Sequence, residues 1–402
     1  MKNREEYVKK LLQFKDKPLI KVVTGIRRCG KSTLLKLFEK KLLDSGVPAN
    51  RIIFMNFESF AFDHITTPQA LHAYLQSQLT QSTMTYYLLL DEIQMVPSWE
   101  KVINSLLVDA QVDIYITGSN AYLLSSELAT LLSGRYVEIK MLPLSFKEYL
   151  DFTRPVARQE IPQSFQQYMK YGSFPTVVEL LEHPETIGPF LDGIFHTVLI
   201  KDVINRNEIR DSALLENLVK FIASNIGSIV STKKISDYLV SHGRKTTPDT
   251  IDNYLRMLEK AFIIYKAPRY DLKGKTFLKT LEKYYMVDIG IRNQLCGLRN
   301  VDIGHILENI VYLELLRRGY EVSIGKIGSL EVDFVARKAS DIHYFQVSAS
   351  ILDQNTRMRE LKPLQEISDN YAKTILTLDQ TPYQDYAGIK VVHLIDFLRE
   401  KN

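Results

Sequence analysis

Short apolar runs alternate with amphipathic segments through the first third of the chain. Compact apolar runs rich in β-branched residues indicate buried strands, and apolar residues spaced three and four apart indicate helices. The predicted strands are 19–24, 51–57, 86–90, 112–117 and 136–140. The predicted helices are 7–14, 32–43, 68–81, 99–109 and 125–132. Strands that alternate with helices at this spacing predict an α/β fold, with a parallel sheet covered on both faces.

The pattern changes near Pro143 and becomes helical to about residue 207. Three amphipathic helices and two strand-like segments follow, at 214–225, 232–240, 247–261, 262–269 and 277–287. Three helices followed by a two-stranded hairpin form the outline of a winged helix. In the last part of the chain, the pattern of apolar and polar residues predicts a second α/β domain. Its helices are 304–318 and 361–371, and its strands are 321–326, 330–337, 342–347, 372–376 and 389–393.

Composition narrows the class of protein without identifying it. Hydrophobic residues make up 45% of the 402 residues and charged residues 24%, which is ordinary for a globular protein. Two cysteines, Cys29 and Cys296, exclude a disulfide framework and fit a reducing compartment. We expect a cytoplasmic protein with no membrane contact, because no apolar stretch approaches the roughly 20 residues that a span needs.

The segment 25–32, Gly25-Ile26-Arg27-Arg28-Cys29-Gly30-Lys31-Ser32, has the G-x-x-x-x-G-K-S form of a phosphate-binding loop. It lies between a predicted strand and a predicted helix, which is the context that the motif requires. Backbone N–H groups at the helix N-terminus favour phosphate oxygens, and Lys31 adds a positive charge. The Ser32 hydroxyl is a Mg²⁺ ligand in such loops. The predicted ATP-binding residues are Gly25, Arg28, Cys29, Gly30, Lys31, Ser32 and Thr33.

A second acidic motif follows the strand 86–90. Asp91 is predicted to hold Mg²⁺ together with Ser32, and Glu92 to orient or deprotonate the attacking water. Asn120, after the next strand, could help place that water or could cap the following helix. Arg135 could reach the nucleotide of a neighbouring subunit as an arginine finger, or could be a surface residue.

Together these residues resemble the prokaryotic AAA+ ATPases of the archaeal-ATPase type, which carry a C-terminal domain of unknown function. The motifs that carry the resemblance are Val23-Thr24-Gly25-Ile26-Arg27-Arg28-Cys29-Gly30-Lys31-Ser32-Thr33, Leu90-Asp91-Glu92-Ile93-Gln94, Thr117-Gly118-Ser119-Asn120-Ala121, Ser133-Gly134-Arg135 and Leu142-Pro143-Leu144-Ser145-Phe146. Tyr171-Gly172-Ser173-Phe174-Pro175 resembles the short motif between the two parts of these proteins. The resemblance implies ATP binding and hydrolysis by an AAA+ core.

The C-terminal part also resembles the PD-(D/E)XK nuclease fold. Glu308, Asp333 and Gln346 stand where such a site places its Mg²⁺ ligands. The lysine that should follow two residues after Gln346 is replaced by Ser348, which argues against DNA cleavage. The predicted domains are an ATPase core (1–143), a helical lid or linker (144–210), a winged-helix-like domain (211–297) and a nuclease-like domain (298–402).

Basic residues concentrate in the predicted winged helix. Residues 231–283 contain 12 Lys/Arg and 6 Asp/Glu, a balance of +6 in a chain of net charge +4. The basic residues singled out are Lys233, Lys234, Arg244, Lys245, Arg256, Arg269, Lys273 and Lys275. They could contact the DNA backbone, or form a solvated or subunit-packing face. Three functions stay open: an oligomeric ATPase acting on nucleic acid, a nucleotide-dependent switch for a protein partner, and an ATP-coupled nuclease.

Overall fold

The computed structural model describes residues 4–79, 84–119, 132, 134–154, 158–278, 281–380 and 385–400. The chain divides into two compact units: Met1–Met141 with Lys260–Phe262, and Leu142–Glu259 with Ile263–Asn402. The first holds a parallel sheet and the second a separate, mixed sheet. The predicted α/β class, with a parallel-sheet core and a second sheet domain, is therefore confirmed.

The sheet of the first unit has the order β2-β3-β4-β1-β5, and all of its neighbouring strands are parallel. Its strands are β1 (Ile20–Thr24), β2 (Ile52–Asn56), β3 (Tyr86–Asp91), β4 (Val112–Gly118) and β5 (Tyr136–Lys140). Because β4 lies between β1 and β3, the carboxyl ends of these three strands meet at one edge. In open parallel sheets this is the edge at which ligands bind.

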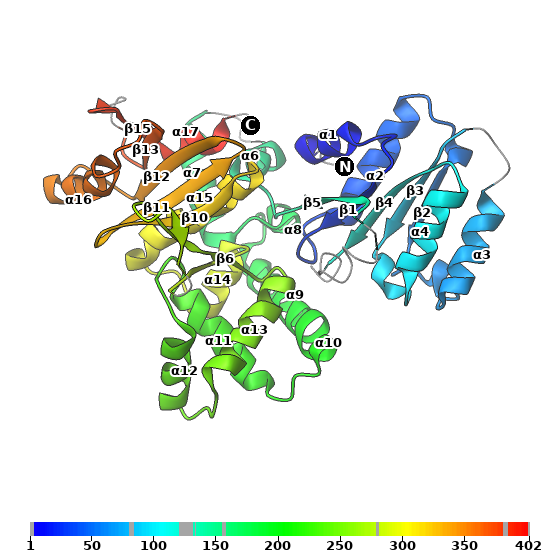
Figure 1. Cartoon of the computed structure of the whole chain (residues 1–402), viewed down its shortest axis with the longest axis horizontal. Coiled ribbons are helices and arrows are strands. Elements are labelled where there is room, and N and C mark those ends of the chain that lie inside the picture. The colour runs from blue at the N-terminus through cyan, green and yellow to red at the C-terminus, as the bar shows by residue number, and fades with distance from the viewer. Residues whose placement is uncertain are drawn as a thin grey trace. The chain divides into compact units, whose positions relative to one another are not determined.

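Helices cover both faces of this sheet (Figure 1). They are α1 (Glu5–Gln13), α2 (Lys31–Asp44), α3 (Pro68–Gln78) and α4 (Trp99–Asp109), with short turns η1 (Ala49–Arg51), η2 (Phe60–Phe62) and η3 (Ile93–Met95). Alternate strand residues such as Leu88 and Ile116 pack with α3 and α4 in one apolar cluster. On the other face, Phe38 of α2 contacts Tyr115, with 4.4 Å between ring centroids. Each fully buried side chain of this size stabilises the fold by about 1.5–3 kcal/mol.

A buried ion pair closes the amino-terminal end of the sheet. Lys21 at the start of β1 and Asp113 on β4 are 0% and 2% exposed, and their side chains form a direct ion pair. The Tyr115 hydroxyl and the Asp16 backbone N–H both donate to Asp113 Oδ2 at 2.8 Å. Burial lowers the pKa of Lys21, against the attraction of Asp113. Removing either partner alone would therefore leave the other charge buried without compensation.

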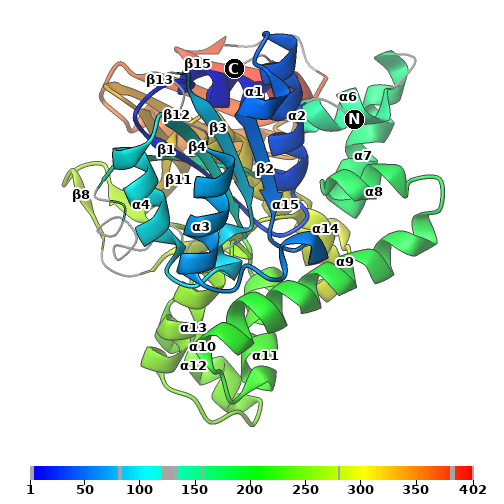
Figure 2. The same ribbon diagram turned by 90° about the vertical axis from the view of Figure 1, so that its right-hand side faces the viewer.

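The second unit begins with helices. They are α6 (Phe146–Thr153), η5 (Arg158–Glu160), α7 (Ile161–Tyr171), α8 (Pro175–Glu179), η6 (Pro184–Thr186), α9 (Ile187–Thr197), η7 (Val198–Ile204), α10 (Asn205–Asn207), α11 (Ser212–Ser224), α12 (Thr232–Ser241) and α13 (Pro248–Lys260). A capping box starts α6, in which Ser145 and Glu148 satisfy each other's backbone N–H groups. Figure 2 shows α9 running through the π-helical segment η7 into α10.

The residues that follow β5 are held by hydrogen bonds inside the second unit. Arg317 Nη2 donates to the carbonyl oxygens of Pro143 at 3.1 Å and Leu144 at 3.2 Å. The Leu144 N–H donates to the Ser173 carbonyl at 2.8 Å, and the Tyr168 hydroxyl donates to the Leu144 carbonyl at 3.0 Å. The backbone at this junction is thus fixed from three directions.

The Tyr-Gly-Ser-Phe-Pro motif has a structural role in this unit. The Ser173 N–H and hydroxyl donate to Asp288 Oδ2 at 2.6 and 2.8 Å. Gly172 has φ +82°, and a Cβ placed there would lie 2.2 Å from Asp288 Oδ1. Only glycine combines this backbone conformation with so close an approach.

The second sheet has eight strands in the order β14-β15-β13-β12-β11-β10-β7-β8, and β6 pairs separately with β9. The strands are β6 (Ile264–Ala267), β7 (Arg269–Asp271), β8 (Thr276–Phe277), β9 (Lys283–Met286), β10 (Glu321–Ile327), β11 (Leu330–Lys338), β12 (Asp341–Ser348), β13 (Ala372–Thr377), β14 (Asp385–Tyr386) and β15 (Ile389–His393). The accompanying helices are α14 (Ile289–Cys296), η8 (Asn300–Asp302), α15 (Ile303–Arg317), α16 (Gln354–Gln365) and α17 (Leu394–Arg399).

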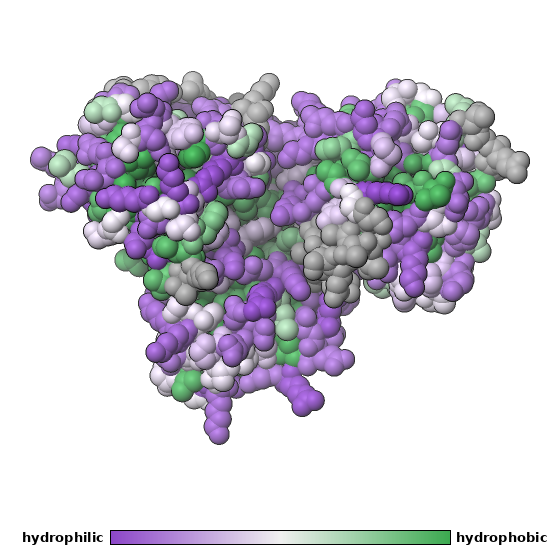
Figure 3. Space-filling view, viewed as in Figure 1, coloured by the Kyte–Doolittle hydropathy of each residue, from purple (hydrophilic) through white to green (hydrophobic). Residues whose placement is uncertain are grey.

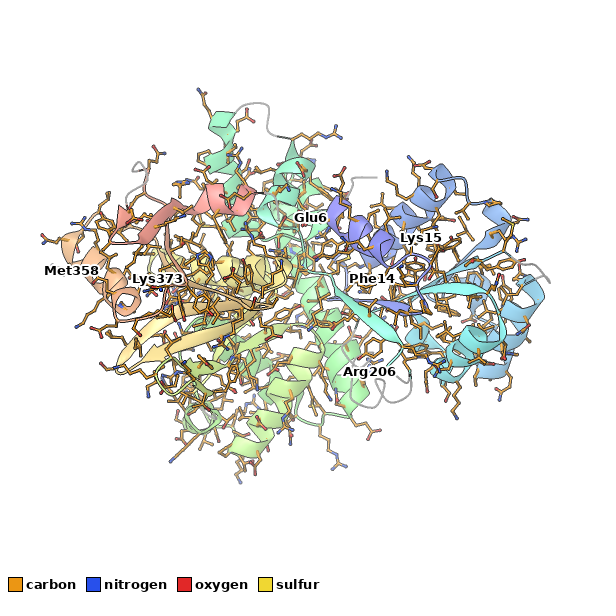
Figure 4. All side chains as sticks on the ribbon, turned by 45° about the horizontal axis from the view of Figure 1, so that its top comes forward. Glu6, Phe14, Lys15, Arg206, Met358 and Lys373 are labelled. Atoms are coloured by element: carbon orange, nitrogen blue, oxygen red, sulfur yellow. The ribbon has the colours of Figure 1, made fainter. Side chains whose placement is uncertain are left out.

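Two expected elements differ from the structure. The predicted strands 262–269 and 277–287 do pair antiparallel, through β6 and β9, but the ladder is interrupted at Pro268, which has no N–H and whose carbonyl accepts the Ile324 N–H at 2.9 Å. As a result β7 runs parallel to β10 in the large sheet. The helix predicted at 361–371 begins earlier, because the Asp353 side chain caps it by accepting the Thr356 N–H at 2.8 Å. Its outer residue Met358 is 61% exposed and points away from the domain in Figure 4.

Candidate nucleotide site

The phosphate loop joins the carboxyl end of β1 to the first turn of α2. Gly25 has φ +152°, and a Cβ there would lie 2.1 Å from the Met141 carbonyl oxygen. Arg28 and Gly30 also have positive φ, at 65° and 107°, and the Cys29 side chain is fully buried. Burial raises the pKa of the Cys29 thiol, which keeps it neutral. The loop backbone is thus fixed by its conformation, with the α2 N-terminus at its end.

Two arginines, one before the loop and one within it, hold the loop in place. Arg4, at the start of α1, is buried, and its Nη1 donates to the Cys29 carbonyl at 2.9 Å. Arg27, inside the loop, pairs with Glu58 after β2, with 3.2 Å between Nη1 and Oε1. Arg28 is exposed. The structure therefore gives Arg4 and Arg27 positioning contacts, and places Arg28 at the surface of the loop.

Lys31 lies inside the loop, with only 4% of its surface exposed. Its Nζ donates to the carbonyl oxygens of Gly25 at 3.0 Å and Ile26 at 3.3 Å. It also lies 3.6 Å from Glu92 Oε1. The predicted cationic residue and the predicted general base are thus neighbours at one end of the sheet.

Asp91, Glu92 and Thr117 form a connected group beside the loop. The Thr117 hydroxyl on β4 donates to Asp91 Oδ1 at 2.5 Å and accepts the Glu92 N–H at 3.0 Å. Glu92 has left-handed backbone with φ 54°, and the Gln94 side-chain amide donates to its Oε2. The Thr117 hydroxyl therefore orients the Asp91 carboxylate and fixes the Glu92 backbone, while Gln94 and Lys31 contact the Glu92 carboxylate.

The environment of Asp91 fits a divalent cation. Burial raises the pKa of Asp91, while hydrogen bonding from Thr117 and Ser32 and the charge of Lys31 oppose this rise. Its second oxygen, Oδ2, is buried and has no partner of full hydrogen-bond geometry among the described residues. A buried oxygen of this kind calls for a ligand. Asp91 and the half-buried Ser32 hydroxyl supply the oxygen ligands that Mg²⁺ prefers.

The structure does not bring every predicted site residue to this edge. Arg135 is exposed and precedes β5, and its carbonyl accepts the Ile20 N–H at 2.8 Å. It therefore lies at the amino-terminal end of the sheet, about 16 Å along the strands from Thr24. Within its own chain it is remote from the phosphate loop. Asn120 lies outside the described residues, and Thr33 is exposed on the first turn of α2.

Three residues of the site are not predicted from the motifs. Thr117 and Arg4 make the contacts given above. Glu138 on β5 accepts a hydrogen bond from Thr24 at 2.7 Å, and burial raises its pKa. The sequence offers one signal for Thr117, a polar residue at the end of an apolar strand, but the prediction gave the polar role at this strand end to Asn120.

This fold and this site define a P-loop ATPase of the AAA class. A family model described as "AAA domain" matches residues 17–150, and one described as "Domain of unknown function (DUF8612)" matches residues 162–302. The chain is 43% identical to an uncharacterized protein of Haemophilus influenzae, over 99% of this chain and 98% of that protein. It is 30% identical to an uncharacterized protein of Methanocaldococcus jannaschii, over 94% of this chain and 86% of that protein. The chain belongs to the family of these proteins, with its AAA domain and its second domain of unknown function.

A solved structure supports the same fold. A Walker-type ATPase of Pyrococcus abyssi superposes with a TM-score of 0.52 at 19% identity, covering 73% of this chain and 96% of that one. None of the helices in the described ranges has the length and apolar character that a membrane span requires.

Proposed function

We propose that this protein hydrolyses ATP with Mg²⁺ at the loop of residues 25–32. The loop backbone and Lys31 bind the phosphates, and Ser32 and Asp91 hold the metal, which stabilises negative charge on the phosphates when bound. Glu92 orients and deprotonates the attacking water, and Asn120 assists in placing it. The observation that carries the proposal is the Thr117 hydroxyl, which donates a hydrogen bond to the Asp91 carboxylate and accepts one from the Glu92 N–H. The Glu92 carboxylate in turn lies 3.6 Å from Lys31.

Two substitutions separate binding from turnover. Lys31→Ala removes the cation inside the loop, so ATP affinity should fall and turnover with it. Glu92→Gln keeps the shape of the side chain and should retain ATP binding while turnover falls about 100-fold or more. Asp109→Asn, an exposed carboxylate at the other end of the sheet, is the matched control. ATP turnover at the wild-type rate in Lys31→Ala or Glu92→Gln would refute the site assignment.

We further propose that Arg135 completes the site of a neighbouring subunit in an oligomer. Arg135→Ala should bind ATP normally and lose turnover. Mixing Arg135→Ala with Glu92→Gln should restore part of the activity, because an Arg135→Ala subunit keeps its own Glu92 and receives Arg135 from its neighbour. No recovery in the mixture, with both variants assembled, would exclude action in trans.

The task coupled to hydrolysis is proposed to involve nucleic acid. Basic side chains on α12, on the loop to α13 and on the β7–β8 turn remain available: Lys233, Lys234, Arg244, Lys245, Lys273 and Lys275. Around α12, Figure 3 shows mostly hydrophilic side chains, with some apolar ones such as that of Val240, which is 50% exposed, among them. Arg256 pairs with Asp252 on the same helix, and Arg269 is only 9% exposed, so these two contribute less than the sequence suggests.

DNA binding is tested with the double substitution Lys233→Ala and Lys234→Ala. Affinity for a fluorescent duplex, measured across a salt series, should fall, and the slope against log salt should decrease by about 1–2. Lys101→Ala on α4 is the control, since that exposed lysine lies in the other unit. If DNA neither binds at low salt nor stimulates turnover, the protein is instead a nucleotide-dependent switch for a protein partner.

A further inference from the structure

A buried lysine lies among carboxylates in the C-terminal part of the chain. Lys283 on β9 is 3% exposed, and its Nζ lies 2.8 Å from Glu308 Oε1 on α15 and 2.7 Å from Glu331 Oε1 on β11. The Tyr285 hydroxyl donates to the same Glu308 oxygen at 2.5 Å. His305 Nδ1 lies 3.9 Å from the other oxygen of Glu308. We call Lys283, Glu308, Glu331 and Asp333 the lysine–carboxylate cluster.

The cluster stands where the predicted nuclease-like site should bind Mg²⁺. The order α15-β10-β11-β12-α16-β13 places Glu308 on the first helix and Asp333 on the second strand. Gln346 and Ser348 follow on the third strand, and both are buried. Ser348 donates to the Ser350 carbonyl at 2.9 Å and turns away from a catalytic role.

The residues present do not fit a divalent cation. The ammonium of Lys283 already lies at hydrogen-bond distance from Glu308, one of the predicted metal ligands, and from the neighbouring carboxylate of Glu331. Asp333 Oδ2 already accepts the Val347 N–H at 2.8 Å. Among the described residues, no group of three His, Cys, Asp or Glu side chains is arranged to hold a metal ion.

We propose that the Lys283 side chain permanently occupies the cation position of this cluster, so that the domain binds no divalent metal there and β9 is anchored to α15 and β11. The ammonium lies within 2.8 Å of both Glu308 and Glu331, which supply the opposite charge that a buried lysine needs. The cation is supplied by β9, which precedes the nuclease-like segment in the chain. The ion pairs connect β9 directly to α15 and to β11.

The experiment uses the full chain carrying Asp91→Asn, which disables the proposed metal site of the ATPase unit. Terbium luminescence excited through tyrosine reports a metal at the cluster, because Tyr285 contacts Glu308 directly. With Lys283 intact, no signal that depends on Glu308 is expected. Lys283→Ala should gain one site, with Tb³⁺ and Mn²⁺ affinity increased roughly tenfold or more, since a like charge has been removed. Glu308→Gln added to Lys283→Ala should abolish the new metal site. Lys283→Arg keeps the positive charge and should gain no metal site.

Two outcomes would overturn the proposal. The first is Mn²⁺ or Tb³⁺ binding to the chain with Lys283 intact that Glu308→Gln removes. The second is a folded Lys283→Ala chain, judged by circular dichroism, that gains no metal. If Lys283→Ala does not fold, the proposal is still tested by the first outcome, the Glu308-dependent metal binding of the chain with Lys283 intact.

Discussion

The hydroxyl of Thr117 is expected to be essential for both the stability of the ATPase unit and its activity. Thr117→Val keeps the shape of the side chain and removes only the hydroxyl, so no cavity forms. Asp91 Oδ1 loses a donor and the buried Glu92 N–H loses an acceptor. Each buried group left unsatisfied costs about 1–3 kcal/mol, so the free energy of unfolding should fall by about 2–5 kcal/mol.

The single tryptophan of the chain makes this loss measurable in one unit. Trp99 lies on α4, is 5% exposed and belongs to the core of the ATPase unit, so its fluorescence follows the unfolding of that unit. With a urea m-value near 2 kcal/mol/M, the midpoint should fall by about 1–2.5 M. Thr117→Ser keeps the hydroxyl and should lose only about 1 kcal/mol for the missing methyl group.

The same substitution predicts a change in the pH profile of ATP turnover. The Thr117 hydrogen bond lowers the pKa of Asp91 against burial, so its loss raises that pKa further. Mg²⁺ binding needs the ionised carboxylate, and Thr117→Val should therefore lose activity at a higher pH than the wild type as the solution is acidified. If Thr117→Val has the same urea midpoint as Thr117→Ser and loses ATP turnover at the same acidic pH, the proposed role of the Thr117 hydroxyl is wrong.

Three further predictions concern stability. Lys21→Met should cost about 3–5 kcal/mol, measured by tryptophan fluorescence, and Asp113→Leu added to it should recover most of that loss; equal loss in single and double variants would contradict the ion-pair account. Gly172→Ala should lower the thermal midpoint well beyond Gly243→Ala, which has the same φ of +82° but open space around it, so equal shifts would disprove the packing argument. Burial raises the pKa of Glu259 from 4.5 to about 7, so the folded state favours the protonated carboxyl. As the pH rises from 4.5 to 7, the free energy of unfolding should therefore fall by on the order of 3 kcal/mol. Glu259→Gln should flatten this slope, as followed by calorimetry, and an unchanged slope would assign it to other groups.

The parts of the site that lie close together in sequence could be predicted from it. The loop 25–32 is contiguous, and Asp91 and Glu92 directly follow an apolar strand, so local pattern was sufficient. Thr117 and Arg4 join the site through contacts 26 and 25 residues away. No local pattern marks these contacts, because the pairing of β3 with β4 brings Thr117 to Asp91, and the packing of the segment before α1 brings Arg4 to Cys29.

The same limit applies to the C-terminal part. The replacement of the expected lysine by Ser348 is visible in the sequence, and it argues against cleavage. The ammonium that fills the cluster comes from Lys283, on a strand assigned to another domain, so its role depends on tertiary packing. Pro268 is also present in the sequence. Its effect on the hairpin depends on the distant Ile324 N–H, which donates to the Pro268 carbonyl, and no local pattern shows this contact.

The backbone at Met141–Leu144 is a very short covalent connection across the boundary between the two units. At one end, the Met141 carbonyl lies against the first glycine of the phosphate loop, and the Met141 N–H donates to the Thr24 carbonyl at 2.7 Å. At the other end, Arg317 holds the Leu144 carbonyl. Three peptide links span at most about 11 Å, and Pro143 stiffens them further. Met141 can therefore move away from the Leu144 anchor only within this span, and inserted glycines would lengthen the span without removing the hydrogen bonds at either end.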